Sequence, residues 1–149
     1  MTSFLSVPNK IHHALLVVTR LAVSYGEDAS VSLEEIAREE GISQGYLEAV
    51  VAPLRRAEIV GGRRGAGGGY RLLQDPARLS VADIIAAIEG PLVIMDCLEG
   101  GVGCARAGSC ANRDVWQTVQ HRIMADLESM TVAEAAGLPK AKSKKLRHA

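Results

Sequence analysis

A glycine-rich stretch in the middle of the chain restricts its fold more than any other feature. Residues 59–73 read IVGGRRGAGGGYRLL, in which two short apolar runs flank a loop of arginine and glycine. Glycine permits positive φ and tight turns, so the stretch predicts two strands joined as a β-hairpin. The loop lacks the lysine and Ser/Thr of a Walker phosphate-binding sequence, and no parallel-sheet pattern surrounds it. A hairpin is therefore favoured over a nucleotide site.

Two helices joined by a tight turn are expected just before the hairpin. The sequence SLEE has the pattern of a capping box, with Ser32 as N-cap and Glu35 reaching back to it. Gly41 ends this short helix, and Ser43 then caps the next helix, which has the sequence QGYLEAVVAPLRRA. A hairpin that follows a helix-turn-helix is a wing, so the pattern predicts a winged helix-turn-helix.

The end of the helix that Ser43 caps carries two residues that fit it poorly. Pro53 predicts a kink, because proline removes a backbone hydrogen bond and crowds the preceding turn. A glycine would suit the helix end better than Glu58, since many helices end in a left-handed residue.

Helical spacing of apolar residues predicts three further helices. Residues 9–25 form the first, which Gly26 can end, and the sequence SVAD caps another that runs through Ile88. A longer helix is expected from Asp114, followed by a capping box in the sequence TVAE. The long helix has an apolar stripe outside the winged-helix unit, so we expect it to meet a second copy of the chain in a homodimer. The stripe consists of Val115, Trp116, Val119, Ile123, Leu127 and Met130.

The composition and charge indicate a cytoplasmic protein with a local basic patch. Hydrophobic residues make up 48% of the 149, and no uninterrupted apolar run is long enough to span a membrane. The N-terminus lacks the basic start and apolar centre of a signal peptide. The net charge is zero, but the last eleven residues carry five bases and no acid, which predicts a disordered basic tail over 139–149. Residues 55–71 hold five arginines against one acid, which indicates a directed contact with an anion.

All three cysteines of the chain lie in one glycine-rich segment, DCLEGGVGCARAGSCANRD. In a reducing compartment such thiols indicate metal binding or redox chemistry rather than disulfides. Glycine lets the backbone fold around a metal, so Cys97, Cys104 and Cys110 could converge on an iron–sulfur cluster or on zinc. Zinc motifs usually show closely spaced cysteine pairs, which are absent here. Three unconnected thiols are the remaining alternative.

These pieces, in this order, resemble the Rrf-two family of bacterial transcription regulators, typified by IscR, NsrR and RirA. The matching segments are GISQGYLEAVVAPLRRAEIV, RRGAGGGYRL and DPARLSVADIIAAIEGPL, then the three cysteines and the long helix. The resemblance covers nearly everything from residue 10 to about residue 136. It implies a homodimer of DNA-binding winged helix-turn-helix units that crosses over through the long helix. In many members three cysteines bind an iron–sulfur cluster, 2Fe–2S or 4Fe–4S, whose status changes DNA affinity.

The fourth ligand of such a cluster is open, because IscR-like proteins have a histidine three residues after the third cysteine and this chain has Arg113. An arginine stays protonated and cannot donate a lone pair to a metal. Carboxylates at Asp96, Glu99 and Asp114 are local candidates. In NsrR-like relatives an acidic residue near the start of the first helix reaches the cluster of the other subunit. Alignment through the following RLA brings that position to His12, and imidazole ligates iron in Rieske-type sites. The expected ligands are Cys97, Cys104, Cys110 and His12.

Predicted DNA contacts lie on the helix that Ser43 caps and on the hairpin. Side chains at the start of a recognition helix reach base edges in the major groove, where Gln44 can read adenine and Glu48 can accept from cytosine. Tyr46 either contacts phosphate or packs. Arginines at the helix end suit phosphates, and Arg64 at the wing tip suits a narrow minor groove. The predicted DNA-binding residues are Ser43, Gln44, Tyr46, Glu48, Arg55, Arg56, Arg63 and Arg64.

The sequence thus predicts a mainly α protein with a small β-hairpin wing that represses or activates transcription. An iron–sulfur cluster is expected to gate its operator affinity in response to iron, nitric oxide or redox state. The alternatives are a winged-helix module with structural zinc or no metal, and a thiol-based redox sensor. A redox enzyme is disfavoured, because no general base adjoins a cysteine and no cofactor loop is present. The expected domains are a winged helix-turn-helix over 1–90, a cluster-binding loop over 91–113, a dimerisation helix with a short helix over 114–138, and the basic tail.

Overall fold

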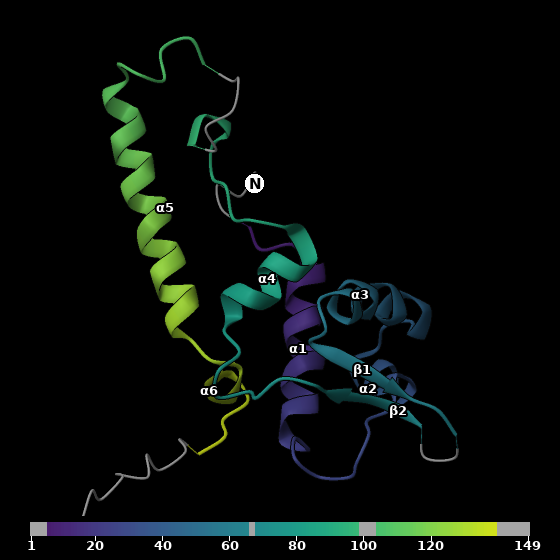
Figure 1. Ribbon diagram of the computed structural model, residues 1–149. Coiled ribbons are helices and arrows are strands. Elements are labelled where there is room, and N and C mark those ends of the chain that lie inside the picture. The colour runs from purple at the N-terminus through teal and green to yellow at the C-terminus, as the bar shows by residue number, and fades with distance from the viewer. Residues whose placement is uncertain (1–5, 66–67, 99–103, 140–149) are drawn as a thin grey trace, which may run out of the picture.

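The computed structural model describes residues 6–65, 68–98 and 104–139, and their fold is mainly helical with one antiparallel hairpin (Figure 1). This architecture confirms the fold class predicted from the sequence. Most of the predicted basic tail lies outside the described residues. The elements are α1 (Asn9–Val23), α2 (Leu33–Glu40), α3 (Gln44–Arg56), β1 (Val60–Arg63), β2 (Gly69–Leu72), α4 (Val81–Glu89), the 3-10 helix η1 (Asp96–Leu98), α5 (Ala111–Ser129) and α6 (Val132–Ala135).

Helix α1 lies at the centre of the fold. Its residues Val17 and Leu21 are buried, and the helix packs against α3, α4, α6 and β2. The core is aliphatic, as expected for a chain with one tryptophan, one phenylalanine and three tyrosines. Val132 of α6 is also fully buried, and Thr131 before it forms a β-bridge with Ser80. The segment after α5 therefore returns to the core of the winged-helix unit.

Side-chain caps start the helices where the sequence predicts them. The Ser43 hydroxyl accepts a 3.2 Å hydrogen bond from the Tyr46 N–H at the start of α3. Ser32 caps α2, but it accepts from Glu34 rather than Glu35, so the described hydrogen bonds do not close the box predicted in SLEE. Both reciprocal bonds of a capping box form at the starts of α4 and α6, in the pairs Ser80–Asp83 and Thr131–Glu134.

The end of α3 turns at a residue in an unfavourable conformation. The N–H groups of Glu58 and Ile59 donate to the carbonyls of Arg55 and Leu54, each at 3.0 Å, in the pattern of a Schellman motif. Glu58 has φ 55°, in the left-handed region that glycine adopts readily and other L-residues do not. The expectation that a glycine would suit this position is confirmed. The helix itself continues past the buried Pro53 to its last residue without interruption.

Strands β1 and β2 pair along their full length, and Val31 adds a bridge at the edge of the hairpin. The backbone groups of Val31 and Tyr70 exchange hydrogen bonds of 2.8 Å in both directions. A Cβ on Gly69 would lie 2.5 Å from the Val31 carbonyl oxygen, so this close approach requires glycine. The loop before α2 therefore holds β2 at Gly69 and Tyr70, the end of the strand that lies next to the hairpin turn.

Helix α5 stands apart from the winged-helix body, as Figure 1 shows, and packs on α4 and η1. It begins at Ala111, three residues before the predicted start at Asp114, because Cys110 serves as the N-cap residue. Cysteine is not among the usual N-cap residues, so the sequence pattern missed this start. The structure describes all 19 residues of α5, and none of them is buried. Across the described parts of the chain, no helix is long and apolar enough to cross a membrane.

Candidate nucleic-acid interface and cysteine site

Helix α3 has one face in the core and one face open to solvent. Leu47, Val50 and Val51 are buried, so the opposite side of the helix is exposed. Gly45 lies on the exposed side, and a Cβ there would meet no described atom within 4 Å. The structure brings the residues predicted to read bases and phosphates together on this side. They are Ser43, Gln44, Tyr46, Glu48, Arg55 and Arg56, all exposed.

Gln44 and Glu48 are joined on this exposed face. The Nε2 atom of Gln44 donates a 3.1 Å hydrogen bond to Oε1 of Glu48, one helical turn away. A carboxylate can only accept, so the amide must turn its nitrogen toward Glu48. The orientation of the Gln44 amide is therefore set by its neighbour.

Tyr46 is held by a histidine to which the sequence assigned no part in DNA binding. The Tyr46 hydroxyl lies 3.0 Å from Nδ1 of His13, and the two rings meet edge to face with centroids 5.3 Å apart. Tyr46 remains 37% exposed, so part of its side chain stays open to solvent although its hydroxyl and ring contact His13. The pair links the start of α1 to the start of α3 across 33 residues of sequence, a distance that no local pattern spans.

Of the two arginines predicted for the wing, Arg63 is engaged within the protein and Arg64 is exposed beside the hairpin tip. Nη1 of Arg63 lies 2.7 Å from Oδ1 of Asp28 and 3.3 Å from the Asp28 carbonyl oxygen. Asp28 belongs to the loop between α1 and α2, and no sequence pattern marks it as a partner of Arg63. This ion pair ties the hairpin to that loop and partly offsets the charge that Arg63 would offer to DNA.

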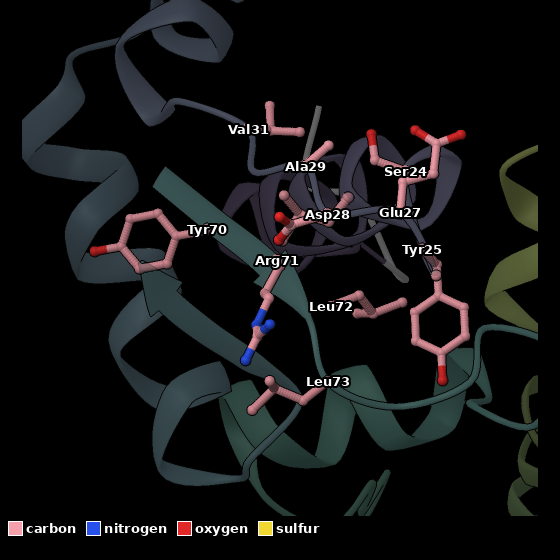
Figure 2. Close-up of a pocket in the computed structure, with 12 residues that line it drawn as sticks. Ser24, Tyr25, Glu27, Asp28, Ala29, Val31, Tyr70, Arg71, Leu72 and Leu73 are labelled. Carbon is pink, nitrogen blue, oxygen red and sulfur yellow. The ribbon is translucent and has the colours of Figure 1, made fainter. Parts of the chain in front are cut away.

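A cleft of about 440 Å³ adjoins this ion pair (Figure 2). Its lining comes from the end of α1, the loop that holds Asp28, and strand β2. Figure 2 shows Tyr25 and Glu27 on one wall and Arg71 on another. Among the described residues that line it there is no cysteine or histidine, so the cleft is separate from the cysteine site.

Two side chains of α5 form hydrogen bonds to the backbone of residues 94–97, at and just before the start of the cysteine segment. Nε of Arg113 donates to the Cys97 carbonyl oxygen at 3.2 Å, and Oε1 of Gln120 accepts from the Ile94 N–H at 3.0 Å. Arg113 occupies the position at which IscR-like proteins have a histidine, and it binds the backbone of the cysteine segment. Cys97 therefore lies within reach of one arginine side chain from the start of α5, where Cys110 is the N-cap residue.

The three thiols differ in their surroundings. Cys97 and Cys110 are partly buried, whereas Cys104 is exposed on the turn that precedes α5. Over the residues that the structure describes, no three His, Cys, Asp or Glu side chains are grouped closely enough to hold a metal ion. In donor chemistry the three thiols fit an iron–sulfur cluster, because such clusters are held by cysteine thiolates. Closing a site around one requires the three thiols to come closer together than they lie in this structure.

The candidates for a fourth ligand are spread over two parts of the chain. His12 is exposed on α1, and its ring centroid lies 5.4 Å from that of His13. Asp96 and Asp114 are exposed near the cysteines, and Glu99 lies outside the described residues. Among the described residues, none of these side chains forms a group of three potential metal ligands with the cysteines.

Comparison with known proteins relates this whole arrangement to one family. A family described as "Iron-dependent Transcriptional regulator" (Rrf2) matches residues 7–137. The regulator CymR of Bacillus subtilis is 33% identical over 132 residues, which cover 89% of this chain and 90% of the relative. The regulator IscR of Yersinia pseudotuberculosis is 33% identical over 110 residues, which cover 74% of this chain and 66% of the relative.

Solved structures of such regulators have the same fold. The structure of CymR, described as the global cysteine regulator of B. subtilis, matches with a TM-score of 0.76 at 31% identity and covers 90% of this chain and 98% of that one. The structure of T. potens IscR matches with a TM-score of 0.72 at 34% identity and covers 90% of this chain and 88% of that one. The chain therefore belongs to the Rrf2 family of DNA-binding transcriptional regulators, and it is not an enzyme.

Proposed function

We propose that the chain acts as a homodimer whose operator affinity is set by an iron–sulfur cluster on Cys97, Cys104 and Cys110. The observation that carries the proposal is the hydrogen bond from Arg113 to the Cys97 carbonyl, which joins the segment of Cys97 to the first turn of α5, the helix whose N-cap residue is Cys110. The family description as iron-dependent supports the same chemistry. A bound cluster supplies iron and sulfide that respond to oxidants, nitric oxide or iron shortage.

The dimer is proposed to form along α5. The apolar stripe of this 19-residue helix is only partly covered in one copy of the chain, because no residue of α5 is buried and Val115 in the stripe is 58% exposed. An apolar cavity of about 280 Å³ adjoins the stripe, between Ile123, Ile85 of α4 and Ile11 of α1. A second copy that covers this surface would remove apolar area from water, which is the main source of association free energy.

His12 is proposed as the fourth ligand, contributed to the cluster of the partner subunit. Its exposure on α1 leaves the imidazole accessible to a second chain. Arg113 cannot serve as a ligand, and its guanidinium is already bonded to the cysteine segment. An imidazole is a known iron ligand in Rieske-type clusters.

The DNA interface is proposed to consist of the exposed face of α3 and the hairpin tip. Gln44 and Glu48 would meet base edges, while Ser43, Tyr46, Arg55 and Arg56 would meet phosphates. Arg64 would enter the minor groove beside the wing. Because Arg63 is bonded to Asp28, its contribution is proposed to be mainly the anchoring of the wing.

A thiol-based redox sensor is the second candidate. The exposure of Cys104 favours it, because accessible thiols are the ones that oxidants reach. Two of the relatives also point to thiol chemistry, since one is described as a cysteine regulator and another, from Staphylococcus aureus, was solved in an oxidised form. In this candidate a covalent change at a cysteine replaces loss of the cluster as the signal.

Anaerobic purification of the full chain, with an absorption spectrum and iron and sulfide analysis, separates the candidates. A cluster-binding regulator carries both elements and changes its affinity for a selected DNA site when the cluster is removed. Protein that is free of iron and sulfide, but loses DNA affinity on oxidation and regains it with a thiol reductant, supports the thiol sensor. Zinc at one equivalent per chain, with no effect of oxidant, contradicts both.

A further inference from the structure

The hydrogen bond between Gln44 and Glu48 changes what each side chain can offer to DNA. We infer that the two residues read DNA as one unit. Gln44, oriented by Glu48, selects adenine over guanine at one base pair, and Glu48 selects cytosine at a neighbouring base pair. The inference rests on the proposed role of α3 as the recognition helix. It adds that Glu48 determines base preference at two positions, one of them through Gln44.

The amide of Gln44 has a restricted choice of base once it is bonded to Glu48. In the major groove adenine presents one acceptor and one amino donor, whereas guanine presents two acceptors. A primary amide has two N–H donors and one carbonyl acceptor. Because Glu48 occupies one N–H of Gln44, the amide has one donor and one acceptor left, which match adenine. Without Glu48 the same amide could donate both N–H groups to guanine.

The carboxylate of Glu48 keeps one oxygen free to meet a base. One of its oxygens accepts from Gln44, and the other oxygen is available only as an acceptor. Cytosine presents its amino donor with no acceptor beside it in the major groove, while the other three bases present acceptors that repel a carboxylate. The second oxygen of Glu48 therefore suits cytosine.

The spacing on the helix limits how far apart the two bases can be. Residues one turn apart on a helix have Cβ atoms about 5–6 Å apart. Successive bases on a strand rise by about 3.4 Å, so the two bases read lie within two base pairs of each other. Gly45 and Ala49 flank the pair on the exposed face, and their small side chains leave room for the groove edge to approach.

Selection of binding sites from a random-sequence DNA pool tests the inference with the full chain and three variants at exposed positions. In Glu48→Ala, cytosine preference should disappear and guanine should be accepted in place of adenine. In Glu48→Gln, the new amide oxygen still accepts from Gln44, so adenine preference should remain while cytosine preference is lost. In Gln44→Ala, only the adenine preference should be lost. Each preference should fall by about tenfold or more, the usual contribution of one good base contact.

The outcomes separate the inference from the proposed function. If wild-type protein enriches no sequence, α3 is not a base-reading helix and the proposed function itself fails. If wild-type protein enriches a site but Glu48→Ala changes preference at a single base pair, the residues act independently and the inference is wrong. It is also wrong if Glu48→Gln and Glu48→Ala have the same effect on the adenine position. Thermal unfolding of each variant confirms that the fold is retained.

Discussion

Glu58 shows at the residue scale how one side chain can work against an otherwise regular helix end. The Schellman hydrogen bonds form around it, yet its φ of 55° suits glycine. Glu58→Gly should stabilise the protein, because relief of the left-handed strain of about 1–2 kcal/mol exceeds the extra entropy that glycine has when unfolded. We expect a net gain of about 0.5–1 kcal/mol, measured by urea unfolding at fixed protein concentration.

Ala57 provides the matched control for this substitution. It precedes Glu58 and has φ −83°, which any residue adopts, so Ala57→Gly should lower stability. A loss of stability in both variants would show that the Glu58 side chain contributes a contact that outweighs its conformation.

Arg113 has a structural role as a single residue. Its removal should make the cysteine segment more mobile even in protein without a cluster. Its guanidinium bonds the Cys97 carbonyl, and hydrogen bonds from charged groups contribute about 1.5–3 kcal/mol. In Arg113→Ala the amides of residues 94–98 should exchange with deuterium about tenfold faster. Arg122→Ala, at an exposed position on the same helix, should leave this exchange unchanged. Equal exchange in both variants would remove Arg113 from the role given to it.

At the scale of elements, local patterns in the sequence predicted most helices but not their contacts. The capping boxes of α4 and α6 were predictable because each one is complete within four residues. The start of α5 was missed because its N-cap residue is a cysteine, whose side chain makes no capping hydrogen bond. The bonds that shape the candidate sites join residues far apart, such as His13 with Tyr46 and Arg63 with Asp28. A single sequence has no periodicity that reveals such pairs, so the bond between Arg63 and Asp28 that holds the hairpin could be found only in the structure.

The hairpin offers a test of how an element meets DNA. Arg64→Ala should weaken binding to a selected site about tenfold and reduce the slope of affinity against salt by about one, because one phosphate or minor-groove contact is lost. Titrations at several salt concentrations measure both values. Arg78→Ala removes an exposed arginine outside the hairpin and α3, and it should change neither. An unchanged slope in Arg64→Ala would exclude the wing tip from the interface.

For the whole molecule, the partly exposed apolar stripe of α5 makes dimer formation the central expectation. Val115 is largely exposed in one copy, so Val115→Asp should leave the protomer folded and bury an unpaired charge only in the dimer. That burial costs several kcal/mol, of order 100-fold or more in the dissociation constant, and it occurs twice across a two-fold axis. Sedimentation velocity should therefore show a monomer. Ala125→Asp, on the opposite side of α5, should stay dimeric, and dissociation of both variants or of neither would contradict the proposed interface.

The proposed ligation by His12 also belongs to the whole molecule, because it joins a histidine of one chain to the cysteines of another. In homodimers, His12→Ala should shift the spectrum and shorten the lifetime of the cluster, and Cys104→Ala should abolish the cluster. A mixed dimer of the two variants distinguishes ligation across the interface from ligation within a chain. The His12→Ala chain keeps its cysteines and receives the intact imidazole of the Cys104→Ala chain, so this dimer should hold one cluster with the wild-type spectrum. If the mixed dimer shows the spectrum of the His12→Ala homodimer, any ligation by His12 lies within its own chain. If His12→Ala alone leaves the spectrum and lifetime unchanged, His12 is not a ligand, and the carboxylates near the cysteines take its place.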